Sequence, residues 1–214
     1  MTPEILDGIV RQEDFVDGTT PYIYQIAGQS FDGEKLYREY EMFSKSLGFD
    51  DKQGQFNLHV RSKSIEAGMS KRDLMTDFCG SLHPKKNGGF TVLENEFDTV
   101  HPILRGSYTE EVINAVKEVS IETFGRIRWL VLQPKTCYSM HGDPDWFRLH
   151  VPMKTSKKAF FIVNEKYYEM HQEGGLYVIH PNKMHTAVNS NLYDKRVHIV
   201  FDTVVRTEPD YETD

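Results

Sequence analysis

The sequence predicts an α+β fold with a mainly β C-terminal half and with helices from the N-terminal half packed against it. The first observation is that several short runs rich in β-branched and aromatic residues follow residue 125, each closed by Pro, Gly, Asn or Asp. Short strands separated by turn signals are typical of a β-sandwich or barrel. The second observation is that the clearest helical periodicity lies before residue 125. The predicted strands are RIRWLVLQP, WFRLHVPM, KAFFIV, GGLYVIHP and KRVHIVFDTVV.

The N-terminal half contains two predicted helices and one predicted strand. In EKLYREYEMFSKSL, residues 34–47, apolar side chains recur at helical spacing, and Gly48 follows as a stop signal. The segment QFNLHVRSK alternates well enough to be a strand. SYTEEVINAVKEVSIETFG is the clearest helix, which Ser107 or Thr109 can cap and which Gly125 is expected to end.

No linker divides the chain, so we expect one domain over residues 1–214. Within it, residues 1–125 are expected to form mixed helical and strand support and a candidate substrate lid, with Asn57, His59 and Arg61 as lid residues. Residues 126–205 form the predicted β core, and the polar residues 206–214 form a tail.

Composition limits the classes of protein that the chain can belong to. No apolar run is long enough for a membrane span, and the acidic N-terminus lacks the apolar core of a secretory signal. Cys79 and Cys137 form no CxxC pair, which favours reduced thiols in the cytoplasm. The formal net charge of −7, without a long basic run, argues against a protein that coats nucleic acid. We therefore expect a cytoplasmic protein with no membrane partner and not one that coats nucleic acid. An enzyme that acts on nucleic acid through one local groove stays open, as does the oligomeric state.

The stretch SMHGDPDWFRLHVPM places titratable residues beside an apolar strand, which predicts a metal site. His141 and Asp143 are two positions apart, so in extended structure their side chains share a face. His185, which follows a strand and a Pro-Asn turn, is the best third ligand, with His180 as a fallback. Two histidines and one carboxylate leave three coordination positions open, which suits Fe(II) that binds a cosubstrate and O2 together.

The last predicted strand supplies a candidate anion clamp. By alternation, Arg196 and His198 lie on the face opposite to Val197, Ile199 and Phe201. An arginine that faces into a β-sandwich is costly unless it pairs with an anion, and a dicarboxylate would be such an anion. The earlier strand repeats the pattern: Arg148 and His150 lie on one face, and Leu149 and Val151 lie on the other.

This pattern resembles that of Fe(II)/2-oxoglutarate-dependent dioxygenases of the aspartyl/asparaginyl β-hydroxylase branch, which includes free-proline hydroxylases. The motif is His141-x-Asp143, then Arg148-x-His150, then His185, then Arg196, and the resemblance covers residues 126–205. It implies a double-stranded β-helix of the jelly-roll or cupin type. It also implies iron bound by the two histidines and Asp143, and the far carboxylate of 2-oxoglutarate bound by Arg196. The Arg148-x-His150 pair would lie near cosubstrate and substrate.

One departure bears on the substrate. Aspartyl β-hydroxylases proper have a non-ligating residue where this chain has Asp143, which points to relatives that keep the full triad. The implied activity is O2-dependent hydroxylation of an unactivated C–H bond in a small molecule or peptide that bears a carboxylate. A free amino acid, a protein side chain and another small acid all stay open. Trp146 either walls the substrate pocket or anchors an apolar turn.

Two other interpretations remain. GGLYVIHPNKMHTAVN resembles the second cupin motif through Gly175, Pro181, His185 and Asn189, which would imply a metal-dependent isomerase or a small-molecule-binding protein. The cupin first motif, however, would require His-x-His and a downstream Glu. The last interpretation is a metal-free β-sandwich interaction module in which Arg196 pairs with Asp143 or Asp202.

Overall fold

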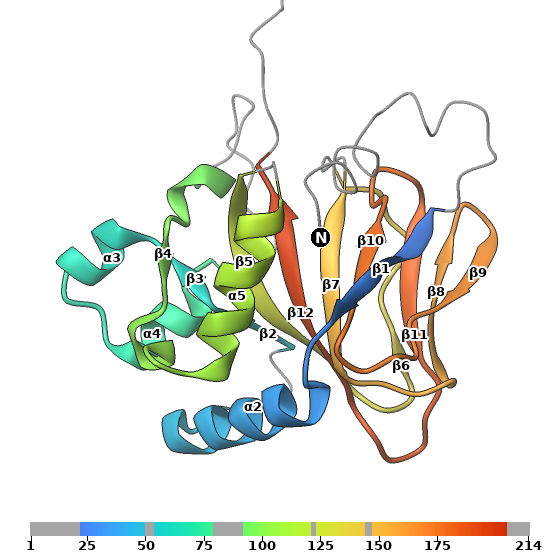
Figure 1. The fold of residues 1–214 in the computed structure, drawn as a ribbon, viewed down its shortest axis with the longest axis horizontal. Helices are drawn as coiled ribbons and strands as arrows, with labels where there is room; N and C mark the ends of the chain where they lie inside the picture. The colour runs from blue at the N-terminus through green and yellow to red at the C-terminus, as the bar shows by residue number, and fades with distance from the viewer. Residues whose placement is uncertain (1–21, 50–53, 79–91, 121–122, 144–146, 205–214) are drawn as a thin grey trace, which may run out of the picture.

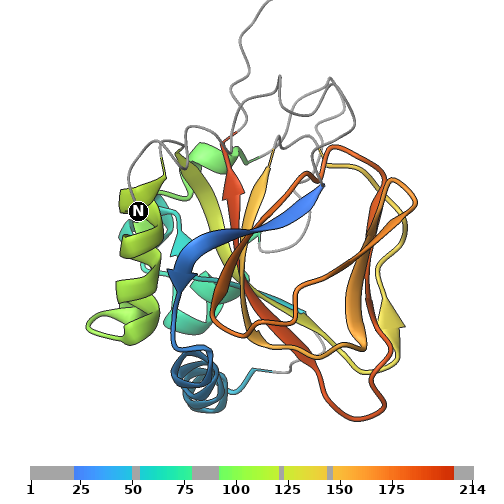
Figure 2. The same cartoon turned by 45° about the vertical axis from the view of Figure 1, so that its right-hand side comes forward.

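A computed structural model of the chain describes residues 22–49, 54–78, 92–120, 123–143 and 147–204. Two antiparallel sheets face each other as a double-stranded β-helix, which confirms the predicted fold class (Figures 1 and 2). The six-stranded sheet has the order β1-β10-β7-β12-β5-β2 and the four-stranded sheet the order β6-β11-β8-β9. Their strands are β1 (Ile23–Ser30), β2 (Gln55–Asn57), β5 (Phe124–Leu132), β6 (Thr136–Cys137), β7 (Arg148–Lys154), β8 (Ala159–Val163), β9 (Lys166–Glu169), β10 (Gly175–Ile179), β11 (His185–Asn189) and β12 (Arg196–Thr203).

The two faces of the six-stranded sheet have different roles. Its outer face packs on the helices through one large core, to which β12 contributes Val197, Ile199 and Phe201. Its inner face, together with the smaller sheet, encloses a second apolar cluster that includes Phe161 of β8 and Tyr177 of β10. The alternation predicted for β7 and β12 is therefore confirmed: the apolar side chains turn to the helices, and the polar ones turn into the barrel. This arrangement places the candidate site residues inside the barrel.

The helices flank the outer face, as Figure 1 shows. They are α2 (Gly33–Leu47), α3 (Ser62–Glu66), α4 (Lys71–Thr76) and α5 (Tyr108–Val119), with 3-10 turns η3 (Glu94–Glu96) and η4 (Pro102–Leu104) and a small ladder of β3 (His59–Val60) and β4 (Thr99–Val100). Asp32 caps α2 at its N-terminus by accepting from the N–H of Lys35, and Gly48 ends it at φ +65°. Both ends of α2 agree with the sequence prediction. None of the helices in these segments is long and apolar enough to cross a membrane.

The end of helix α5 differs from the prediction. Ser107 caps the helix, as expected, but the helix stops at Ser120 rather than at Gly125. Gly125 instead lies in β5, where a Cβ atom would come 2.5 Å from the backbone oxygen of Glu94. The glycine is therefore explained by the close approach of the η3 backbone and not by a helix end.

The N-terminal half extends the six-stranded sheet through β1, which was not predicted, and through β2, which lies in the predicted strand QFNLHVRSK. The helices α3 and α4 were not predicted either. The three expected lid residues are bound within that half. The amide of Asn57 donates to the carbonyl oxygens of Leu74 and Asp77, and Arg61 forms an ion pair with Asp77. His59 is buried, with Nδ1 2.9 Å from two carbonyl oxygens. The observed contacts of these three side chains connect segments of the N-terminal half to one another.

Gly125→Ala tests the close approach to Glu94. We expect the substitution to lower the free energy of unfolding by about 1–3 kcal/mol, because the new methyl group forces the η3 backbone away from β5. Chemical denaturation measures the change. Gly142→Ala is the control, since the nearest atom to its Cβ would lie at 3.5 Å, an ordinary contact. Equal stability of the Gly125 variant and the wild type would contradict this explanation of the glycine.

Candidate metal centre

His141 and His185 face each other across a β-bridge. The backbone N–H of His141 donates to the oxygen of His185 at 3.0 Å, and the N–H of His185 donates to the oxygen of His141 at 2.7 Å. Side chains of directly opposed residues in an antiparallel pair lie on the same face. Their ring centroids are 4.4 Å apart. The backbone pairing thus brings together two imidazoles that are distant in sequence.

Both imidazoles have the tautomer that a metal ligand needs. Nδ1 of His141 lies 2.6 Å from the carbonyl oxygen of Ser139, and Nδ1 of His185 lies 2.9 Å from that of Lys183. Because a carbonyl oxygen only accepts, each Nδ1 carries the proton and each Nε2 carries the lone pair. Burial lowers the pKa of His185, although the bond to Lys183 opposes this effect, so the ring is neutral at pH 7. The two Nε2 atoms can therefore offer their lone pairs to one cation.

Asp143 completes the cluster. Its N–H donates to the carbonyl oxygen of Pro181 at 2.8 Å, which holds the segment beside the turn before β11. Its Oδ2 lies 3.8 Å from Nε2 of His141 and 3.7 Å from Nε2 of His185, and the ligand atoms of the three residues lie within 4.8 Å of one another. Two imidazoles and one carboxylate are the donor set of non-haem Fe(II) oxygenases. The residues therefore fit Fe(II), and metal binding by them stays a prediction.

Arg196 is a buried cation without an anion. Its side chain is 1% exposed, and none of its three guanidinium nitrogens has a hydrogen-bond partner among the described residues. The guanidinium carbon lies 4.7 Å from the ring centroid of Phe161. Burial lowers the pKa of Arg196 to about 10, so the group stays charged at neutral pH. A buried charge of this kind is costly without an anion, and the described residues supply none.

The neighbours of Arg196 inside the barrel are neutral. His150 and His198 are buried with their Nδ1 atoms 3.3 Å apart, a distance at which one ring donates to the other. Burial, strengthened by the charge of Arg196, lowers the pKa of both rings well below 6.5. The hydroxyl of Tyr138 is also buried without a partner in the described segments, and burial raises its pKa. Sequence reasoning missed Tyr138, whose place inside the barrel depends on the pairing of its backbone with Ala187.

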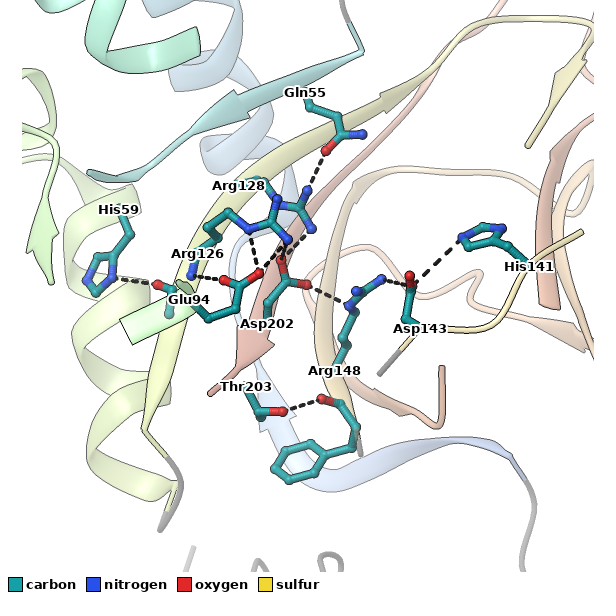
Figure 3. A network of polar contacts seen from close by, with 12 residues as sticks. Gln55, His59, Glu94, Arg126, Arg128, His141, Asp143, Arg148, Asp202 and Thr203 are labelled. Atoms are coloured by element: carbon teal, nitrogen blue, oxygen red, sulfur yellow. Dashed lines mark hydrogen bonds and ion pairs between the residues drawn. The ribbon is translucent and has the colours of Figure 1, made fainter. Parts of the chain in front are cut away.

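Arg148 is bound to two carboxylates. Its NH1 donates to Oδ2 of Asp143 at 2.6 Å, and its Nε lies 2.6 Å from Oδ1 of Asp202. Figure 3 shows these contacts as one chain from His141 to Asp202. Arg148 thus contacts a candidate metal ligand, and its expected place near cosubstrate and substrate stays a prediction.

Asp202 is the centre of a buried ionic network (Figure 3). Its carboxylate pairs with Arg128 and lies 3.6 Å from Arg126, which is bound in turn by Glu94. Burial alone would raise the pKa of Asp202, but the charges of Arg128, Arg148 and Arg126 outweigh it and lower the pKa to about 2. The carboxylate is therefore ionised and balances guanidinium groups from two neighbouring strands.

Other sequence expectations have different outcomes. The ion pair of Arg196 with Asp143 or Asp202, required by the metal-free interpretation, is absent from the described residues, because Arg148 binds both carboxylates. His180 stacks with Tyr24 and is not part of the ligand cluster. Figure 3 places His59 on the opposite side of the network from His141. Trp146 lies outside the described residues.

Comparisons with known proteins identify one matching family. A family model described as aspartyl/asparaginyl beta-hydroxylase matches residues 101–206, which include every candidate ligand and Arg196. No curated protein matches the chain.

Three solved structures illustrate the similarities in structure. The plu4264 protein from Photorhabdus luminescens is 17% identical with a TM-score of 0.31, over 36% of this chain and 60% of that one. A 2OG-Fe(II) oxygenase family oxidoreductase from Burkholderia pseudomallei is 13% identical with a TM-score of 0.37, over 45% of this chain and 55% of that one. The viral collagen prolyl hydroxylase of Paramecium Bursaria Chlorella virus-1 is 12% identical with a TM-score of 0.42, over 88% and 98%. The chain thus spans somewhat more than half the length of the first two proteins.

Arg196→Met tests whether the buried guanidinium lacks an internal partner. We expect the free energy of unfolding of the ligand-free protein to rise by about 1 kcal/mol or more, because an uncompensated buried charge is replaced by an apolar side chain of similar length. Chemical denaturation measures it. Arg148→Met is the matched control and should destabilise by about 3 kcal/mol, since it strands two carboxylates. A similar loss of the free energy of unfolding in Arg196→Met and Arg148→Met would contradict the assignment of Arg196 as an unpaired buried charge.

Acid should destabilise the ligand-free protein through His150 and His198. The folded protein holds both rings neutral below pH 6.5, while the unfolded chain protonates them near pH 6.5. The unfolded state then binds more protons, so stability falls as the pH drops below about 6.5, by up to ~1.4 kcal/mol per pH unit for each ring. Urea denaturation of wild type and His198→Asn from pH 5 to 8 measures this slope. A slope that is the same in both proteins would rule out the contribution of His198.

Proposed function

Because residues 101–206 of the chain belong to the aspartyl/asparaginyl β-hydroxylase family, we propose that the protein is an Fe(II)- and 2-oxoglutarate-dependent dioxygenase that hydroxylates an unactivated C–H bond. The observation that carries the proposal is the buried guanidinium of Arg196, which has no partner in the described segments and lies in the same barrel as the ligand cluster. A metal site alone would suit many reactions. A metal site together with an unbalanced cation selects an anionic cosubstrate.

The three clustered side chains would hold the iron. His141 and His185 offer Nε2, and Asp143 offers Oδ2. When bound, Fe(II) supplies the redox chemistry that couples 2-oxoglutarate decarboxylation to hydroxylation by O2, which Zn²⁺ cannot do. The contribution of the protein is to fix the ligands before the metal arrives: the Ser139 and Lys183 carbonyl oxygens orient the rings.

Arg196 would bind the far carboxylate of 2-oxoglutarate. Its guanidinium fork suits a carboxylate, and the partnerless hydroxyl of Tyr138 is a second candidate donor. The pair of His150 and His198 is kept neutral by burial, so it adds no cation that would compete with Arg196 for the carboxylate. The two rings are buried beside Arg196, and the low local dielectric of such surroundings would strengthen its interaction with an anion.

The substrate is proposed to be a carboxylate-bearing amino acid or protein side chain. Arg148 supports this proposal, because it is a cation that contacts a candidate metal ligand, Asp143, and so lies where a substrate carboxylate could bind. Asp143 and Asp202 already bind it, so a substrate carboxylate would have to share Arg148 with them. A cytoplasmic location and the exclusion of a membrane partner and of a role in coating nucleic acid stay predictions.

Anaerobic loading with Fe(II), followed by addition of 2-oxoglutarate and O2, tests the activity. We expect succinate to form only when both Fe(II) and 2-oxoglutarate are present. A mass-spectrometric screen of amino acids and peptides for a gain of one oxygen would then identify the substrate. If no Fe(II)-dependent succinate forms with any candidate, the cupin interpretation, in which the metal serves a different reaction, would replace this one.

His141→Ala and His185→Ala should each abolish succinate formation and reduce iron content far below one Fe(II) per chain, because each removes one of three protein ligands. Metal analysis of the purified variants and the succinate assay measure the two effects. His171→Ala is the control, since this exposed histidine lies outside the cluster. Full turnover by either ligand variant would refute the assignment.

A further inference from the structure

Arg148 and Asp143 meet at the oxygen atom that faces the metal ligands. Oδ2 of Asp143 accepts from Arg148 and is also the carboxylate atom that lies near both histidine Nε2 atoms. A cation that hydrogen-bonds to a metal ligand can compete with the metal for that ligand. The position and the charge of Arg148 therefore bear directly on metal binding, and both depend on what else binds this arginine.

Asp202 is the other partner of Arg148. It is opposite Arg148 in the register of β12 and β7, and its side chain is fully buried. The contact is to Nε, the part of the guanidinium nearest the backbone, while the outer NH1 reaches Asp143. Asp202 thus forms an ion pair with the inner part of the guanidinium, while the outer end donates a hydrogen bond to Asp143.

The charges of the network also indicate that Asp202 influences the carboxylate of Asp143. Arg126, Arg128 and Arg148 are the three guanidinium groups, and Glu94, Asp202 and Asp143 are the three carboxylates. With Asp202 ionised, the six groups balance before any metal is bound. Without its charge, an extra positive charge would act on the oxygen that is to bind a divalent cation, and this would oppose metal binding.

We propose that Asp202 is a positioning residue for the metal centre: it anchors Arg148, which in turn fixes the carboxylate of Asp143 for the metal. The inference rests on the proposed function, because it assumes a metal at His141, Asp143 and His185. It extends that function to a buried residue that touches none of the three ligands in the observed contacts.

The test is metal affinity, measured without turnover. Apo full-length wild type and Asp202→Asn are titrated with Co(II), whose visible absorption reports ligand geometry. We expect Asp202→Asn to bind Co(II) about 10–100-fold more weakly and with an altered spectrum, which is the usual effect of losing an outer-shell partner. Circular dichroism shows whether the variant is folded.

Glu94→Gln is the matched control. It removes a partly buried carboxylate of the network, which binds Arg126 and has no observed contact with Arg148. We expect it to lower stability and to leave Co(II) affinity within about threefold of wild type. An equal loss of affinity in Glu94→Gln and Asp202→Asn would overturn the proposal, since the effect would then be one of total charge or stability.

Arg148→Lys keeps the test decisive if Asp202→Asn does not fold. Lysine retains the charge but has one ammonium group in place of the Nε and NH1 pair that bridges the two carboxylates. We expect the same loss of Co(II) affinity, and wild-type affinity in a folded Arg148→Lys or Asp202→Asn would overturn the proposal. Wild-type protein that binds no Co(II) would instead refute the metal centre itself, which separates the two failures.

Discussion

The inner face of β12 brings charged side chains into the interior of the barrel, and the site is organised by how those charges are paired. Arg196 and Asp202 lie on this face near opposite ends of one strand, and both are buried. Burying an ion is costly unless a counter-charge is at hand. Asp202 has its counter-charges in three arginines, whereas Arg196 has none among the described residues.

This difference distinguishes a charge that is paired within the protein, on Asp202, from a charge that a ligand would pair, on Arg196. The charge of Asp202 is paired by arginines within the protein, so the network can hold Arg148 and Asp143 in place before any ligand binds. Arg196 has no observed ion-pair or hydrogen-bond partner, so a ligand with a carboxylate would relieve its cost of burial. The fold itself tolerates this cost because the outer face of the same strand contributes Val197, Ile199 and Phe201 to the main core. The outer face of the sheet thus contributes the larger core, and the inner face carries the candidate site.

Much of the site could be predicted because strand alternation is a local rule. It placed Arg196 and His198 on the face opposite to Val197, and the two-residue spacing of His141 and Asp143 indicated a shared cation. Long-range register was not predictable. The pairing of Asp202 with Arg148 depends on which residues of β12 and β7 lie opposite each other, and sequence reasoning considered Arg196 as the partner instead. Gly125 was misread for the same reason, since the Glu94 backbone that requires a glycine there is distant in sequence.

The central claim is that Arg196 binds the far carboxylate of 2-oxoglutarate. A comparison of the affinities of two ligands tests this claim most directly. 2-Oxopentanoate has a methyl group in place of that carboxylate and keeps the metal-chelating end. Calorimetric titration of Fe(II)-loaded protein without O2 should show 2-oxoglutarate binding about thirty-fold or more tightly than 2-oxopentanoate, as expected for a charge-assisted buried pair. In Arg196→Met the two affinities should become similar. Equal affinities in the wild type, or an undiminished preference in Arg196→Met, would contradict the account.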